Sequence, residues 1–393
     1  MSSLPSSSVS TALAPYGWDD AWADAFAPYE AEGLLAGRVV RVDRGQCDVV
    51  TAGGLLRADT AFVTPHDPLR VVCTGDWVAV EPGGNPRYVR AYLPRRTAFV
   101  RSTSSKRSEG QILAANVDHA VVAVSLAAEL DLARIERFLA LAWESGAQPV
   151  VVLTKADLVP DAVTRGHLVH DVETSAPRGG GGAPRGPGRR GRAPRPHEVY
   201  PCAPGGRGRT VRARDGEGLD VLAAITAGGT TVLLGQSGAG KSTLANALLG
   251  EDVMDVREIR DVDGKGRHTT TTRNLLALPG GGVLIDTPGL RGVGLWDAGT
   301  GVGQVFSEIE ELAGNCRFHD CAHESEPGCA VLEAVETGGL PQRRLDSYRK
   351  LLRENQYIVA KTDARLRAEI RKDWKRKGAI GKAAMEAKRG RFR

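Results

Sequence analysis

The chain has 393 residues and a mass of 41.7 kDa, enough for two or three domains that each bury a core. Its net charge of +5 conceals basic segments at 343–393 (18 basic and 6 acidic side chains) and 178–214 (10 arginines and one acid), within an otherwise acidic chain. Such segments favour an anionic partner such as nucleic acid. No apolar run reaches the roughly 18 residues of a transmembrane helix, and six cysteines are too few for a disulfide scaffold. The acid-rich N-terminus is unlike a signal peptide, so we expect a cytoplasmic protein without membrane contact.

The apolar residues of segment 1–34 show little periodicity, which predicts a flexible N-terminal arm. Residues 35–95 carry short β-type runs separated by turn signals, and about five such strands are typical of a small OB-like barrel. The runs lie at 38–42, 47–50, 55–57, 71–73 and 76–80. Aromatic side chains of such a barrel can stack bases. They are more often core residues, so we assign no role to Phe62, Trp77 or Tyr88.

Residues 96–300 alternate between strand and helix patterns, which predicts a mostly parallel sheet. Strands are expected at 117–126, 149–153, 230–234 and 283–285. Helices are expected from a cap at Asp131 to a stop at Gly146, and over 241–249. Residues 175–209 are rich in Gly, Pro and Arg and predict a disordered insertion, whose arginines either bind RNA nonspecifically or form a spacer.

The segment from Gly235 to Ser242 fits the phosphate-binding pattern G-x-x-x-x-G-K-[ST], between a predicted strand and a predicted helix. Backbone N–H groups of such a loop surround phosphates, its lysine reaches the β- and γ-phosphates, and its serine binds Mg²⁺. The pattern predicts nucleotide binding by Gly235, Gln236, Ser237, Gly238, Ala239, Gly240, Lys241, Ser242 and Thr243.

A second acidic group is expected beside this loop, and Asp286 follows the apolar run 283–285 within D-T-P-G. Asp286 is therefore a candidate catalytic and Mg²⁺-binding residue, and Gly289 a candidate contact to the nucleotide. A catalytic role is also predicted for Lys241.

The segment Thr154–Lys155–Ala156–Asp157 resembles the guanine-reading N-K-x-D motif of GTPases. An aspartate there can accept hydrogen bonds from guanine N1 and its exocyclic amine, which disfavours the alternative of a P-loop ATPase or kinase. Thr154 replaces the usual asparagine, and Arg212–Ala213 stands where GTPases have Ser-Ala. A coincidental strand end is the competing interpretation of these four residues.

The motif order is permuted, because the base-reading segment precedes the phosphate loop. Permutation joins nearby ends and leaves the same sheet. The predicted fold class is α/β: a circularly permuted P-loop GTPase domain, preceded by an OB-like β-barrel and followed by a helical zinc-binding domain.

The chain resembles the RsgA (YjeQ) family of ribosome small-subunit-dependent GTPases over about residues 35–355. The resemblance rests on the barrel, the run 111–118, T-K-A-D, the phosphate loop, Gly266–Thr271, D-T-P-G and a Cys/His cluster. It implies a cytoplasmic factor that binds the small ribosomal subunit and its rRNA late in maturation, hydrolyses GTP to GDP faster there and then leaves. The alternative is a nucleotide-independent RNA-binding scaffold with a vestigial GTPase fold.

Leu290 follows Gly289, where many GTPases have a water-orienting glutamine, so intrinsic hydrolysis should be slow. Residues 264–271 are expected to form the first switch, with Thr271 touching Mg²⁺ and the γ-phosphate. One hypothesis is that His268 positions the water; the other is that it contacts RNA or packs. We also infer that residues 290–312 pass the nucleotide state to the C-terminal domain.

Residues 316–329 hold a Cys₃His set, Cys316, Cys321, His323 and Cys329, of the kind that closes a structural zinc site. The resemblance assigns the same four ligands. His319 is a nearby competitor, and metal-free thiols are the alternative.

Cys47 and Cys73 are expected to be packing residues, and Cys202 incidental. Helices are expected at 305–312, 341–357 and 361–377. The domain prediction is completed by the GTPase domain at 96–300, the zinc-binding helical domain at 301–360 and a basic RNA-contacting helix and tail at 361–393, in a monomer.

Overall fold

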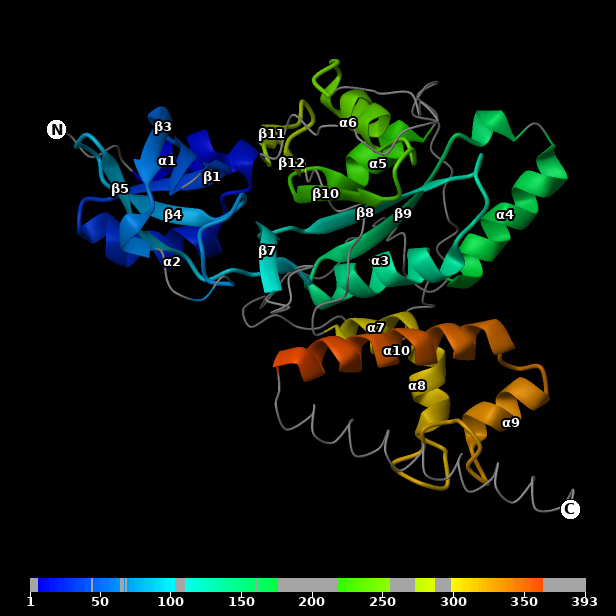
Figure 1. The fold of residues 1–393 in the computed structure, drawn as a ribbon. Coiled ribbons are helices and arrows are strands. Elements are labelled where there is room, and N and C mark those ends of the chain that lie inside the picture. Colours follow the sequence, from blue (N-terminus) through cyan, green and yellow to red (C-terminus); the bar gives the residue numbers. More distant parts are fainter. Residues whose placement is uncertain are drawn as a thin grey trace, which may run out of the picture.

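The computed structural model describes residues 6–43, 45–63, 67, 69–102, 110–159, 161–175, 218–254, 273–286 and 298–362. These residues form a β-barrel with N-terminal helices, an α/β unit and a group of C-terminal helices (Figure 1). Within these ranges no helix has both the length and the apolar character of a membrane span. The predicted insertion beyond residue 175 and the basic tail beyond residue 362 lie outside the described ranges.

The barrel is closed, in the strand order β1-β2-β3-β5-β4. Its strands are β1 (Leu35–Asp43), β2 (Gln46–Thr51), β3 (Gly54–Asp59), β4 (Trp77–Val80) and β5 (Arg87–Tyr92), with a short 3-10 helix η2 (Ala61–Val63) after β3. The prediction of a strand at 71–73 was wrong, since the fifth strand is β5. Residues 71–73 form a loop because the Cys73 N–H donates to the Asp76 carboxylate instead of to a neighbouring strand.

The predicted flexible arm is instead mostly helical between residues 6 and 31. It contains α1 (Ser6–Leu13), η1 (Ala14–Tyr16) and α2 (Asp20–Ala31). Trp18, Trp22 and Phe26 form an aromatic core with Trp77 of the barrel, and the Trp18 and Trp77 ring centroids are 4.8 Å apart. Trp22 and Phe26 stand four residues apart on one face of α2, and Trp18 precedes the N-cap Asp19 of that helix. The clearest sequence signal of this helix is the aromatic spacing, because the residues around the aromatics are mostly alanines and acids.

The α/β unit contains a five-stranded sheet in the order β11-β12-β10-β8-β9. The central strands β8 (His119–Ser125), β9 (Gln148–Thr154), β10 (Thr230–Gly235) and β12 (Val283–Ile285) are parallel, and β11 (Leu275–Ala277) is the antiparallel edge. A separate hairpin, β6 (Ala98–Ser102) and β7 (Gly110–Ala115), links the barrel to this sheet. The prediction of a mostly parallel sheet is confirmed.

Helices cover both faces of the sheet (Figure 1). This follows because the strands carry apolar side chains on both faces. On one face α3 (Leu132–Glu144) packs on Ala120, Val122, Val232 and Leu234. On the other face α5 (Leu219–Thr226) and α6 (Lys241–Leu249) pack on Val121, Val150, Val152 and Leu233. Helix α4 (Ala162–Ser175) follows η3 (Ala156–Leu158). The predicted cap of α3 is present, since the Asp131 carboxylate accepts a hydrogen bond from the Arg134 N–H.

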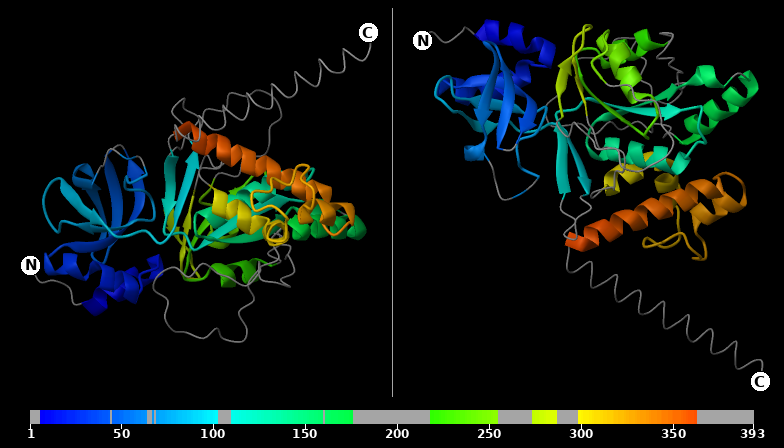
Figure 2. Two further views of the ribbon diagram at one scale, coloured as in Figure 1. Left: turned by 90° about the horizontal axis from the view of Figure 1, so that it is seen from below. Right: turned by 45° about the horizontal axis from the view of Figure 1, so that its top comes forward.

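The C-terminal helices lie on the side of α3 that faces away from the sheet (Figures 1 and 2). They are α7 (Gly299–Val305), α8 (Ser307–Ala313), α9 (Ala330–Glu336) and α10 (Gln342–Thr362). The single helix expected at 305–312 is divided at Phe306, which is fully buried against Tyr348 of α10. One continuous hydrophobic core spans α3, α7 and α10, so these helices are firmly attached to the α/β unit.

A buried ion cluster reinforces this attachment. The fully buried carboxylate of Glu136 on α3 accepts hydrogen bonds from Arg343 and Arg344, each at 2.9 Å, and from the hydroxyl of Ser347. Arg344 also pairs with Glu308 on α8. Because a buried carboxylate is costly without partners, this cluster strongly favours one docking of α10 on α3.

Candidate functional site

The phosphate loop is the turn between β10 and α6. Gly235, Gly238 and Gly240 all have positive φ, of 140°, 76° and 80°. A Cβ at Gly235 would lie 2.5 Å from the Ala123 carbonyl oxygen, so glycine is needed there. Gln236 and Ser237 are exposed, while Ala239 is buried. The loop therefore opens to solvent at the N-terminus of α6, which suits phosphate binding.

Lys241 is folded over this loop. Its Nζ donates to the carbonyl oxygens of Gly235 and Gln236, at 2.8 and 2.7 Å. The side chain thus lies within the space that the loop encloses. When a phosphate binds there, its oxygens would replace the two carbonyl oxygens as hydrogen-bond acceptors of Lys241. Ser242 and Thr243 follow in the first turn of α6 and are partly exposed.

Asp286 stands at the carboxyl end of β12, the strand hydrogen-bonded to β10. Burial raises the pKa of Asp286 above its ordinary value, and the nearby charge of Lys241 partly opposes this shift. A divalent cation would favour the ionised form of the same carboxylate. Asp286 and the phosphate loop therefore follow the carboxyl ends of two neighbouring strands, β12 and β10.

The predicted base-reading segment, Thr154–Asp157, lies at the carboxyl end of β9, two strands from β10. Thr154 is buried, and its hydroxyl lies 2.8 Å from the Ala239 carbonyl oxygen and 3.3 Å from that of Val124. Lys155 adopts a left-handed conformation with φ of 57°, and Asp157 in η3 is exposed. The segment is thus tied to the phosphate loop through Thr154, while the Asp157 carboxylate remains free to meet a ligand.

Several predicted site residues lie outside the described ranges: Ala213, His268, Thr271 and Gly289. Their roles stay predictions.

A second cluster, Cys316, Cys321, His323 and Cys329, lies between α8 and α9, and its four ligand atoms are all within 4.8 Å of one another. The Sγ atoms of Cys316 and Cys329 are 3.8 Å apart, and His323 Nδ1 is 3.4 Å from the Cys329 Sγ. His319 is not part of the cluster. Four soft and imidazole donors at this separation can hold a metal ion.

The surroundings also suit a bound cation. Burial alone would raise the pKa of the Cys316 thiol, but the N–H groups of Ala330 and Val331 and the neighbouring thiols lower it below its ordinary value. Burial lowers the pKa of His323. Burial and the neighbouring thiols raise the pKa of Cys321 to about 12. Cys316 and His323 therefore favour the forms that ligate metals, a thiolate and a neutral imidazole, while Cys321 would lose its proton when a cation binds.

Comparisons with known proteins agree with this arrangement. The RsgA GTPase family profile matches residues 92–175 and 204–296. The chain is 78% identical over 393 residues to "Small ribosomal subunit biogenesis GTPase RsgA" of Streptomyces coelicolor, with all of both chains covered. It is 39% identical to the protein of the same name from Opitutus terrae, over 97% of this chain and 99% of that one.

The fold is shared with two solved structures. "Crystal structure of YjeQ from Thermotoga maritima" matches at a TM-score of 0.54 and 24% identity, over 82% of this chain and 98% of that one. "The crystal structure of YloQ, a circularly permuted GTPase" matches at a TM-score of 0.55 and 21% identity, over 82% and 95%. The predicted permuted fold is confirmed, and the chain belongs to the RsgA GTPase family.

Proposed function

We propose that this GTPase acts in the maturation of the small ribosomal subunit, hydrolysing GTP to GDP and phosphate when bound to the subunit and then dissociating. The observation that carries the proposal is the common edge at which β12, β10, β8 and β9 end. Asp286 and the phosphate loop follow the neighbouring strands β12 and β10, and the Thr154–Asp157 segment follows β9, beyond β8. The names of the relatives supply the subunit as partner.

The chain's residues divide the work of hydrolysis. The loop from Gly235 to Thr243 holds the phosphates and Asp157 reads guanine. Lys241 neutralises charge on the β- and γ-phosphates. Ser242, Thr271 and Asp286 would hold Mg²⁺, which supplies charge stabilisation to the transferring phosphoryl group when bound. His268 is proposed to position the water, which explains a need for the subunit as activator.

Nucleotide state would reach the C-terminal helices through the start of α7. The Ala298 N–H donates to the side-chain oxygen of Asn355 on α10, and the Gly301 N–H donates to Glu144 on α3, both at 2.8 Å. Residue 298 is the first described residue after the D-T-P-G motif at Asp286. A displacement of that motif, passed along the chain to Ala298, would therefore act on α10 through the hydrogen bond to Asn355.

The Cys₃His cluster is proposed to bind one structural Zn²⁺. Tetrahedral Zn–S bonds of about 2.3 Å imply Sγ–Sγ separations of about 3.8 Å, and the Cys316–Cys329 separation is 3.8 Å. Four protein ligands leave no position for catalytic water. The basic segment 361–393 is proposed to contact rRNA, in a cytoplasmic monomer.

The test is GTP turnover by the full chain with and without purified small subunits. Stimulation of at least about tenfold is expected, since the missing water-positioning group would be completed on the subunit. The scaffold alternative predicts subunit binding with no turnover and equal affinity in GDP and GTP analogues. Binding of neither nucleotide would exclude the proposed function.

A further inference from the structure

We propose that the barrel loop of residues 69–76 is a positioning element for the nucleotide site, acting through Thr74 and Gly75 on the segment that carries Asp286. This inference rests on the proposed function and adds a regulatory role for the barrel: its placement on the sheet sets the placement of the Mg²⁺-binding carboxylate.

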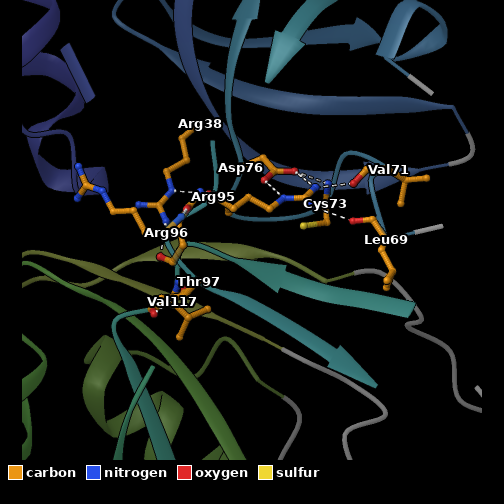
Figure 3. Close-up of polar contacts among 11 residues, drawn as sticks. Arg38, Leu69, Val71, Cys73, Asp76, Arg95, Arg96, Thr97 and Val117 are labelled. Atoms are coloured by element: carbon orange, nitrogen blue, oxygen red, sulfur yellow. Dashed lines mark hydrogen bonds and ion pairs between the residues drawn. The ribbon is translucent and has the colours of Figure 1, made fainter. Parts of the chain in front are cut away.

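The loop is held rigidly within the barrel (Figure 3). Arg95 donates to both carboxylate oxygens of Asp76, each at 2.7 Å, and Asp76 is fully buried. The same guanidinium donates to the carbonyl oxygens of Leu69 at 2.8 Å and Val71 at 2.6 Å. The second Asp76 oxygen also accepts from the Cys73 N–H at 2.8 Å. With its charges paired and its backbone groups satisfied, the loop has one strongly preferred shape.

The tip of this loop touches the segment just before β11 and the last residue of β12. The Thr74 hydroxyl, which is buried, donates to the carbonyl oxygen of Arg273 at 3.3 Å. Gly75 has a φ of 95°, and a Cβ there would lie 2.2 Å from the Ala115 carbonyl oxygen and 3.2 Å from Cδ1 of Ile285. Ile285 directly precedes Asp286. Gly75 therefore brings the barrel backbone against the last residue of β12.

The contacts continue along the backbone to Asp286. Arg41 of β1 forms a β-bridge with Asn274, which adjoins Arg273. The Asn274 carbonyl oxygen then accepts a hydrogen bond from the Asp286 N–H at 2.9 Å. Barrel strand β1, residues 273–274 and Asp286 thus form one hydrogen-bonded series. Moving the barrel on the sheet would shift Asp286 relative to the phosphate loop on β10.

Further hydrogen bonds connect the barrel directly to the α/β unit. The fully buried Arg38 of β1 donates to the Thr230 hydroxyl on β10 at 2.8 Å, and to the carbonyl oxygens of Gly75 and Asn116, each at 3.2 Å. The barrel loop and the start of the phosphate-loop strand therefore share one guanidinium. A displacement of the barrel, such as one caused by RNA docking, would therefore act on both Asp286 and β10.

The test compares Thr74→Val, which keeps the side-chain volume and removes the donor, with Thr74→Ser, which keeps the hydroxyl. One measurement is the Mg²⁺ concentration for half-maximal GTP hydrolysis. The other is deuterium uptake by the peptide spanning 273–286 in the nucleotide-free chain. Thr74→Val should raise the Mg²⁺ midpoint and the exchange rate about threefold each, as the loss of one hydrogen bond implies. The KM for GTP should stay within about twofold, because the base and phosphate loops are untouched.

Thr51→Val is the matched control, since the buried Thr51 hydroxyl also donates to a barrel carbonyl, that of Gly54 at 2.9 Å, away from the sheet. Thr51→Val and Thr74→Ser should both behave like the wild type. The inference is overturned if Thr74→Val changes neither measurement, or if Thr74→Ser changes them equally. If the wild type shows no GTP turnover even with subunits, the proposed function fails. The exchange measurement still decides whether Thr74 fixes Asp286.

Discussion

The hydroxyl of Thr154 donates a hydrogen bond to the carbonyl oxygen of Ala239 across 2.8 Å, joining the Thr154–Asp157 segment to the phosphate loop. A Cβ at Gly240 would also meet this hydroxyl, at 3.5 Å. Threonine stands here where the GTPase motif usually has asparagine, and the hydroxyl supplies a link between the two loops. The predicted base-reading segment and the phosphate loop are therefore connected by this hydroxyl in the absence of the amide.

Thr154→Val should weaken binding of both GTP and GDP by about three- to tenfold, because one buried hydrogen bond is lost and the Ala239 carbonyl is left unpaired. Titration with fluorescent GTP and GDP analogues measures this. Thr154→Ser is the matched control and should retain wild-type affinity. Equal losses in the two variants would show that the methyl group matters, and the hydroxyl does not.

Asp157→Asn should shift preference from guanosine towards xanthosine nucleotides, with GTP affinity falling roughly tenfold or more, because charge-assisted hydrogen bonds to guanine N1 and its amine are lost. Competition binding with GTP and XTP checks this. Asp161→Asn is the control: this exposed carboxylate, four residues on, accepts from the Thr164 N–H instead. An unchanged GTP-to-XTP preference in Asp157→Asn would remove guanine reading from this segment.

Cys329→Ser should abolish stoichiometric zinc, because a hydroxyl is a poor ligand beside two thiolates and an imidazole. Metal analysis of the purified full chain reports the zinc content. His319→Ala serves as the control and should keep one zinc per chain, since His319 stands outside the cluster. Zinc retained in the serine variant and lost in His319→Ala would move the site to the competitor.

Arg344→Ala should destabilise the chain by about 3 kcal/mol, because it removes a buried partner of Glu136. The guanidinium also lies 4.2 Å over the Phe306 ring, so packing is lost too. Urea unfolding followed by circular dichroism measures the difference. Lys350→Ala, on an exposed position of the same helix, should change stability by no more than about 0.5 kcal/mol. Similar effects of both substitutions would argue against a special role of the Glu136 cluster.

His268→Ala should reduce subunit-stimulated GTP turnover by about a hundredfold while GTP affinity stays unchanged, as expected for a water-positioning group. Steady-state phosphate release with purified small subunits measures it. Unchanged subunit-stimulated turnover in His268→Ala would contradict the water-positioning role of His268. Reduced subunit binding with normal turnover at saturating subunit would favour the RNA-contact alternative.

Much of the fold followed from local patterns. The strand at 283–285 and the helix at 241–249 coincide with β12 and α6, because apolar runs and the glycine loop define their ends. The barrel was anticipated, but one strand was misplaced: residues 71–73 are apolar like a strand, yet Asp76 and Arg95 satisfy their backbone groups. The pairing of Asp76 with Arg95, 19 residues apart, has no local sequence signal.

The chain's sequence by itself predicted the nucleotide chemistry and the four residues that could hold a metal ion, since a phosphate loop and a Cys₃His set are local patterns of residue types. Its uneven charge also pointed to an anionic partner. Tertiary structure alone decided how these parts are connected: Thr154 to Ala239, Thr74 to Arg273 and Asn355 to Ala298 join residues 57 to 199 positions apart. Such contacts depend on how the barrel and α10 dock on the sheet unit. Docking is set by shape and buried charge over many residues, which no short segment of sequence expresses.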